Sequence, residues 1–303
     1  MRRMNFKHLW PYAAMATAMT TVGSTVVASK LMAQMPIFVA MLVRFAVASL
    51  LLVTLLLMLR RPWPRLAWAS WKLLLAQAFI GSVGYSALLL LGLGLTGAAD
   101  ASVISGALPA LAALLAVFVL RERLTPASWC AVALAAAAMV PLHMGQALGG
   151  GARHLIGNAL VLAAVACEAV FLLLHKRMRE PLDPLWMAAL MSTFSLLLCA
   201  PIALVQFTLG QTPSFSSSAM MAAVYYALVP TTLGFWLWYS GSSRVTGAQA
   251  GIFTALLPVS GLFLAAAWLG EIVEPRHWIG VSLAVLAIVI GTALGPSPPP
   301  HPT

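Results

Sequence analysis

Residues 165–171 (VACEAVF) place one carboxylic acid, Glu168, within an otherwise apolar run. An ionised carboxylate at the centre of a bilayer costs about 2.5–3.5 kcal/mol on insertion scales. Two chemical uses are open to such a group, the exchange of a proton and the binding of a substrate amine. The structural alternative is a carboxyl held in one state by a packing partner. We favour a functional role, because ionisable groups within a membrane usually mark ion or substrate pathways.

Arg44 interrupts a second apolar run, MLVRFAVASLLL, and is the obvious candidate partner for Glu168. Arginine stays protonated and must find carboxylate or carbonyl acceptors. Because Arg44 stands early in its run, away from the expected midplane, we predict that it holds the bundle together rather than binding substrate.

Hydroxyl groups form a stripe on the first apolar run, with Thr20 and Ser24 as the candidates for a binding site. Gln77 and Tyr85 share a predicted face of the third run. Hydroxyls can instead return a hydrogen bond to their own helix at little cost. Both interpretations of the stripe, cavity lining and helix packing, stay open.

Tyr225 and Trp236 recur on one predicted helical face and could offer a cavity aromatic surfaces for stacking or for a cation. The alternative is that these rings belong to the aromatic belts at the membrane interfaces. Asp100 stands at the start of a run and is expected to cap it. Glu271 ends its run at the water boundary and is expected to pair with a nearby arginine or to lie near a helix end.

The elements that must position these groups are membrane helices. The 303 residues are 62% hydrophobic and 8% charged, whereas soluble domains carry roughly 25% charged residues. A spanning helix needs roughly 20 apolar residues. The sequence predicts an all-α polytopic membrane protein with ten transmembrane helices near residues 10–30, 36–59, 72–95, 100–120, 126–144, 156–174, 184–207, 218–240, 246–269 and 276–294.

The distribution of positive charge predicts the orientation. With the N-terminus inside, the predicted cytoplasmic segments hold 13 of the 17 Lys and Arg residues. This is the asymmetry of the positive-inside rule and places both termini in the cytoplasm. The net charge of +10 therefore gives no reason to expect a nucleic-acid partner. The proline-rich tail, 295–303, is predicted to be disordered.

The sequence repeats itself without a gap. Residues 97–129 align with residues 246–278, so that Pro109 pairs with Pro258 at an offset of 149. We expect two five-helix repeats, 1–145 and 156–294, which must be inverted because five is odd. Inverted repeats are typical of alternating-access transporters. Each proline is either a static kink or a gating hinge.

The repeated segments GALPALAALLAVFVLRERLT and TALLPVSGLFLAAAWLGEIVEP resemble the EamA repeat of the drug/metabolite transporter superfamily. The resemblance covers nearly the whole chain as two copies. It implies a ten-helix carrier of the bacterial inner membrane, and most such carriers export amino acids and other small metabolites without ATP hydrolysis. The second copy departs from the pattern by having Gly-Glu-Ile-Val in place of Glu-Arg-Leu-Thr, which leaves the expected fold unchanged.

Several classes of function are disfavoured. The sequence contains no phosphate-binding loop and no recognisable hydrolase or zinc-protease motif, so we expect neither an enzyme nor a cofactor. The three cysteines have no paired spacing, and no metal site is expected. We predict a monomeric exporter of amino acids or similar amphiphilic metabolites, with protons as a possible coupling ion. The alternative is efflux of cationic drugs, and an intramembrane enzyme is a distant third.

Overall fold

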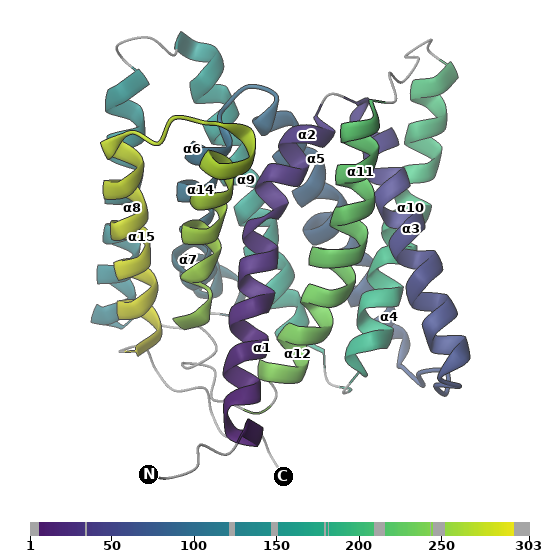
Figure 1. Cartoon of the computed structure of the whole chain (residues 1–303). Helices are drawn as coiled ribbons and strands as arrows, with labels where there is room; N and C mark the ends of the chain where they lie inside the picture. Colours follow the sequence, from purple (N-terminus) through teal and green to yellow (C-terminus); the bar gives the residue numbers. More distant parts are fainter. Residues whose placement is uncertain are drawn as a thin grey trace.

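The computed structural model describes residues 6–33, 35–120, 125–146, 151–178, 180, 182–208, 216–242, 244 and 252–293. Every regular element in these ranges is a helix (Figure 1). A helix satisfies all its backbone hydrogen bonds internally, which is why apolar runs in a bilayer adopt this structure. The all-helical part of the sequence prediction is confirmed within the described residues.

In the first half of the chain, several apolar runs are divided into shorter helical segments. Its elements are α1 (Phe6–Gly23), α2 (Thr25–Met32), α3 (Ile37–Met58), α4 (Trp68–Gln77), η1 (Ala78–Gly84), α5 (Tyr85–Leu93), α6 (Ala98–Ser105), α7 (Leu108–Leu120) and α8 (Pro126–Gln146). The segment η1 is a π-helix that joins α4 and α5 into one continuous span.

The second half repeats this pattern. Its elements are α9 (Gly151–Lys176), α10 (Pro184–Thr208), α11 (Ser217–Tyr226), η2 (Ala227–Gly234), α12 (Phe235–Ser242), α14 (Leu256–Leu269) and α15 (Pro275–Ala293). The segment η2 is a second π-helix, and it starts 149 residues after η1. The offset read from the sequence therefore also relates two unusual helical segments in the structure.

Among the described residues, five helices are long and apolar enough to cross a membrane. A sixth candidate is the pair α6 and α7, which are bent by 45° at a short break. The helices α8, α14 and α15 are shorter and apolar. The two-repeat membrane architecture is thus supported, while the total of ten transmembrane helices remains a prediction.

Both repeat-related prolines follow a break in the helix. Pro109 is the second residue of α7, directly after the turn at Gly106, and Pro258 is the third residue of α14, directly after the turn at Thr254. Proline costs little in the first turn of a helix, where its missing N–H would have no partner. The described geometry accounts for both prolines, and their use as hinges remains a prediction.

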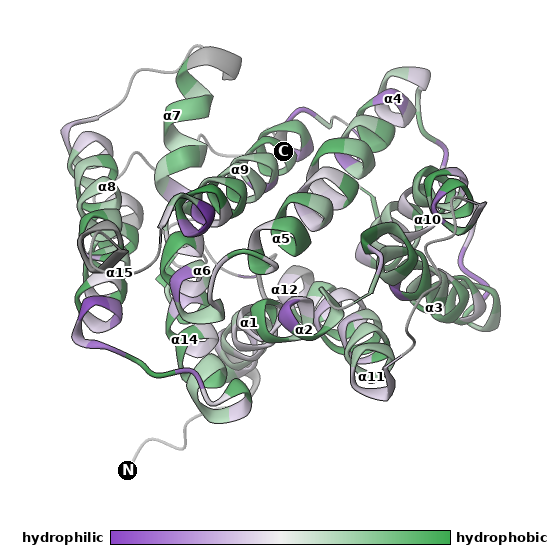
Figure 2. Cartoon of the chain, turned by 90° about the horizontal axis from the view of Figure 1, so that it is seen from above, coloured by the Kyte–Doolittle hydropathy of each residue, from purple (hydrophilic) through white to green (hydrophobic). Residues whose placement is uncertain are grey.

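The two halves interleave. Helix α3 packs on α10, α5 on α9, α8 on α15 and α6 on α14. Seen along the bundle in Figure 2, the α8–α15 pair forms one edge and α3 with α10 lies near the other. Helix α1 begins and α15 ends at the same end of the bundle, the lower end in Figure 1, which we call the terminal end. The other end is called the opposite end.

Candidate functional site

A cavity of about 190 Å³ lies between the two repeats. Both repeats line it: α1, α2, α3, η1, α5 and α7 from the first, and α9, α10, α11, η2, α12 and α14 from the second. Most of its surface is apolar, and two residues of opposite charge, Glu168 and Arg44, face it. This volume is below the range of about 300–1,000 Å³ that is typical for drug-sized ligands, so a small ligand fits best.

Glu168 reaches the cavity because α9 lies very close to η1. A Cβ atom on Gly81 would be only 2.3 Å from the Cβ atom of Phe171, so that only glycine permits this approach. The close contact places Glu168 beside Tyr85 on the wall of the cavity. Within the described chain, the Glu168 carboxylate has no hydrogen bond or ion pair with another residue.

Arg44 is buried, and its guanidinium group is held on three sides. Its Nη1 donates to Ser86 Oγ at 2.9 Å and its Nη2 donates to Thr231 Oγ1 at 3.3 Å. The guanidinium carbon lies 3.5 Å from the ring centroid of Tyr226, which is cation–π geometry. The buried Nε has no hydrogen-bond partner among the described residues. All of these partners are neutral, so the positive charge of Arg44 is not balanced by an anionic side chain of the described residues.

The two π-helical segments shape the cavity from both repeats. From η1 come Gly81 and Ser82, and from η2 come Pro230 and Thr231. A π-helix has i→i+5 hydrogen bonds and is wider than an α-helix, and such segments are frequent at functional sites. The cavity is therefore lined by equivalent segments of the two repeats.

The structure brings three of the predicted site residues together, Glu168, Tyr85 and Arg44. Ser24 and Tyr225 lie outside the cavity lining and bind each other, with 2.8 Å between Ser24 Oγ and the Tyr225 hydroxyl. Thr20 is exposed and donates to the carbonyl of Ala16 in its own helix. These contacts correspond to the helix-packing alternative for the hydroxyl stripe.

Trp236 also lies outside the cavity lining, where it makes an edge contact with Trp10 at 6.4 Å between ring centroids. Gln77 is fully buried, and in the part of the chain that the structure describes neither its Oε1 nor its Nε2 has a hydrogen-bond partner. Gln77 is not part of the cavity wall. Pro109 and Pro258 each lie one residue from a lining leucine and do not line the cavity themselves.

Sequence reasoning missed Tyr226 and Trp238, which line the cavity in the places expected for Tyr225 and Trp236. The lining positions on this span are Tyr226, Pro230, Thr231, Gly234, Phe235 and Trp238, and among them Tyr226, Pro230, Gly234 and Trp238 form a series at a spacing of four. In an α-helix of 3.6 residues per turn this series drifts around the axis, whereas the wider η2 keeps it closer to one face. A run at a spacing of four along this span is the signal that could have found it.

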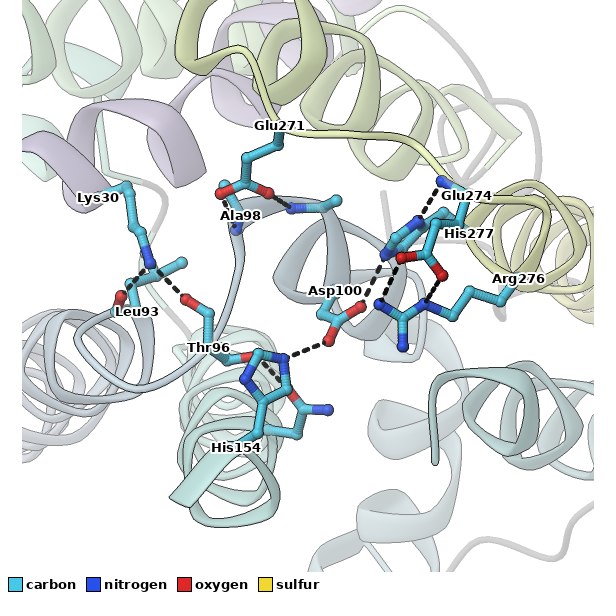
Figure 3. Close-up of polar contacts among 12 residues, drawn as sticks. Lys30, Leu93, Thr96, Ala98, Asp100, His154, Glu271, Glu274, Arg276 and His277 are labelled. Carbon is cyan, nitrogen blue, oxygen red and sulfur yellow. Dashed lines mark hydrogen bonds and ion pairs between the residues drawn. The ribbon is translucent and has the colours of Figure 1, made fainter. Parts of the chain in front are cut away.

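A second group of polar residues lies at the opposite end, around the start of α6 (Figure 3). The carboxylate of Asp100 accepts from His277 Nε2 at Oδ1 and from His154 Nε2 at Oδ2, both at 2.9 Å. His277 Nδ1 accepts the backbone N–H of Glu274, so its proton is on Nε2. Asp100 therefore does not cap α6 through its side chain, contrary to expectation, and joins α6 to α9 and α15.

The cap of α6 comes from the other repeat. Glu271 accepts the backbone N–H groups of Ala98 and Ala99 with its two carboxylate oxygens, each at 2.8 Å. Gly97 allows this approach, because a Cβ there would be 3.1 Å from Glu271 Oε2. Of the two alternatives for Glu271, a nearby arginine or a place near a helix end, the structure shows the second: the carboxylate binds a helix N-terminus, where the free N–H groups and the helix dipole favour an anion.

Comparison with known proteins agrees with this geometry. The sequence profile of the EamA-like transporter family matches residues 9–142 and 155–292, one match for each repeat. The chain belongs to the EamA-like transporter family. This EamA-like protein is 33% identical over 304 residues to the "Uncharacterized transporter YetK" of Bacillus subtilis (strain 168), covering 98% of this chain and 91% of that protein.

A second relative has a more informative name. This EamA-like protein is 27% identical over 196 residues to the "Probable terminal-alkyne amino-acid exporter" of Streptantibioticus cattleyicolor, and the match covers 64% of this chain and 63% of that protein. A solved crystal structure with 22% sequence identity has a TM-score of 0.66, covering 94% of this chain and 99% of the other. That likeness concerns the fold alone.

Proposed function

We propose that this EamA-like transporter exports amino acids or similar small amphiphilic metabolites by alternating access, as a secondary transporter of the bacterial cytoplasmic membrane. The observation that carries this proposal is that Glu168 and Arg44 line the same cavity without pairing with each other. A zwitterion complements this pair of charges. Its ammonium group matches Glu168, and its carboxylate matches the guanidinium of Arg44, whose Nε has no partner.

The alternating-access mechanism is supported by the symmetry around the cavity. The lining includes η1 and η2, which occupy equivalent positions in the two repeats. In transporters built from inverted repeats, the substrate site lies at the interface of the repeats and the halves exchange roles as the site opens to either side. The name of the Streptantibioticus relative supports an amino-acid substrate.

The membrane orientation of this proposal comes from the charge distribution. The terminal end would face the cytoplasm, since the segments assigned to that side hold most of the Lys and Arg residues. Glu168 is then the group that can exchange a proton with the gradient across the membrane.

Efflux of cationic drugs is the second candidate, and the aromatic wall of the cavity favours it. Tyr85, Tyr226 and Trp238 stand around the cavity that also holds Glu168, which is the composition of an aromatic site for a quaternary ammonium ion. Two facts weigh against it: Arg44 already occupies the face of Tyr226, and the cavity is small.

Reconstituted vesicles distinguish the candidates. Purified protein is incorporated into vesicles loaded with a mixture of radiolabelled amino acids, and their exit is followed with and without a pH gradient. Under the proposal, at least one labelled amino acid leaves the vesicles. Its exit is inhibited by the same amino acid without label and is not inhibited by tetraphenylphosphonium. Tetraphenylphosphonium transport without amino-acid transport would contradict it, and equal rates without a gradient would identify a facilitator.

A further inference from the structure

We infer that Lys30 and Glu271 form a latch that keeps the opposite end of the bundle closed, and that this latch must release whenever the cavity opens to that side. The inference rests on alternating access as proposed above. It concerns which residues hold the gate, not which substrate passes through it. The latch is defined here as Lys30, Glu271 and the backbone groups that they bind.

The first half of the latch is the carboxylate of Glu271. Helix α14 ends at Gly270, whose φ of +66° turns the chain back, and Glu271 follows directly. From this turn both of its oxygens reach the N–H groups of Ala98 and Ala99 at 2.8 Å. The start of α6, in the first repeat, is thus held by a residue from the second repeat.

The second half is the ammonium group of Lys30 at the end of α2. Its Nζ donates to the carbonyl oxygens of Leu93 at 2.7 Å and Thr96 at 2.5 Å, at and just beyond the end of α5 (Figure 3). Lys30 also lies within electrostatic reach of Glu271. A cation therefore binds the C-terminal end of one helix while a neighbouring anion binds the N-terminal end of the next, which is the favourable sense for both helix dipoles.

The latch binds backbone groups of residues that belong to a packed apolar layer. This layer consists of Val26, Leu93, Ala98, Ile104 and Leu262, each no more than 1% exposed and all in one packed cluster. Leu93 and Ala98 supply backbone groups to the latch, and Val26 follows Thr25, which lines the cavity. A ligand leaving through this end must part the same helices that Lys30 and Glu271 join.

The neighbouring Asp100 cluster differs in a way that assigns the moving part. Asp100 is 2% exposed, and its bond to His277 is buried while its bond to His154 is part-buried, so breaking both would leave a buried charge unpaired. Lys30 and Glu271 are only partly buried, and water can replace their partners as they separate. We therefore assign α6, α9 and α15 to one body, from which α2 and the end of α14 move away.

The test measures access to the packed layer from each side of the membrane. The native cysteines Cys130, Cys167 and Cys199 are replaced by serine, and Val26→Cys is introduced as the reporter on the opposite-end side. A second reporter, Leu172→Cys, is placed in the cavity wall on α9, on the terminal-end side of Glu168. A membrane-impermeant maleimide is applied to right-side-out and to inside-out vesicles, and labelling rates are compared.

Glu271→Gln keeps the shape of the side chain but removes its charge and replaces one acceptor oxygen by a donor that faces an N–H group. We expect Val26→Cys to label at least about fivefold faster in E271Q, a shift of roughly 1 kcal/mol in the closed–open equilibrium. Leu172→Cys should label more slowly. Lys30→Gln should act in the same direction.

Glu274→Gln is the matched control, because Glu274 stands on the same loop and its carboxylate binds only the nearby Arg276. If Glu271 only stabilises the start of α6 and does not gate, E271Q should lower thermal stability. The labelling rates of the two reporters would then not change in opposite directions. Rates in E271Q and K30Q equal to those in E274Q would overturn the latch. If E271Q does not reach the membrane, K30Q alone decides. Labelling needs no substrate, so absence of amino-acid transport in the wild type would count against the proposed function and leave this result standing.

Discussion

The central cavity and the Asp100–Glu271 region both hold charged groups inside an apolar bundle, but they treat those groups in opposite ways. Around α6, both oxygens of Asp100 and both oxygens of Glu271 receive donors from other segments. In the cavity, Glu168 has no partner in the described chain and Arg44 Nε has none. A satisfied network fixes structure, whereas a charged group that faces a cavity without a protein partner can bind a ligand or exchange a proton.

This difference separates structural charge from functional charge better than burial or residue type does. Both regions lie between the repeats; Glu168 stands within a predicted apolar span, and Asp100 and Glu271 stand at or just beyond the ends of such spans. Only the count of hydrogen-bond partners distinguishes them. Substitutions in the α6 region should therefore act mainly on stability or on gating, and substitutions in the cavity mainly on transport.

The largest effect expected is on stability, from Asp100→Asn. The new amide would place an N–H donor against one of the two histidine donors, and removing one partner of a buried charge network costs about 3–5 kcal/mol. Thermal unfolding of the purified protein in detergent measures this. Asp183→Asn is the control, because Asp183 is partly exposed in its pair with Arg61 at 3.4 Å and should cost less than about 1 kcal/mol. Equal unfolding temperatures for D100N and wild type would refute the assignment.

Glu168→Gln should impair transport and leave the stability of the protein intact, in contrast to Asp100→Asn. We expect gradient-driven transport to fall at least roughly tenfold, about 1.4 kcal/mol, since the one acidic group among the described residues of the cavity wall is lost. The unfolding temperature should stay the same or rise, because no partner is left unpaired. Transport is followed as pH-gradient-driven flux in vesicles. Unchanged flux in E168Q would remove both proton coupling and amine binding from this residue.

Arg44→Lys sharpens the comparison within the cavity. Lysine keeps the positive charge but loses the fork that reaches Ser86 and Thr231 and the planar stacking on Tyr226. We expect amino-acid flux to fall about fivefold to tenfold, roughly 1–1.4 kcal/mol, while a matched amine without a carboxylate is affected less. Competition by each compound in the same vesicles measures the ratio. An equal loss for both compounds would indicate that Arg44 holds the fold and does not recognise the substrate.

The smallest effects separate neighbouring aromatic residues. Trp238→Phe, in the cavity wall, should change the half-saturation concentration of transport severalfold, whereas Trp236→Phe, outside the lining, should leave it within about twofold. Tyr225→Phe removes the hydrogen bond to Ser24 and should cost about 1 kcal/mol of stability with little change in transport. A larger transport defect in W236F than in W238F would place the binding surface on the other face of α12.

The sequence correctly indicated the internal repeat and the unusual carboxylate within an apolar run. The offset of 149 between Pro109 and Pro258 reappears between η1 and η2, which no motif had marked. Glu168 stood out as a carboxylate within an apolar run, and it lines the cavity. Periodicity was a poorer guide to faces, because a π-helix in mid-span rotates every residue after it relative to an α-helical projection.

By itself, the amino-acid sequence determined that this chain is a helical membrane protein of two related halves with one carboxylate in an apolar span, because hydropathy and repetition are properties of the chain alone. Only the tertiary structure decided that Glu168 and Arg44 share a cavity, that Tyr226 replaces Tyr225 there, and that Glu271 caps a helix starting 173 residues before it. Such partners follow from the packing of the two repeats, and a hydrogen bond across that distance leaves no local pattern in the sequence.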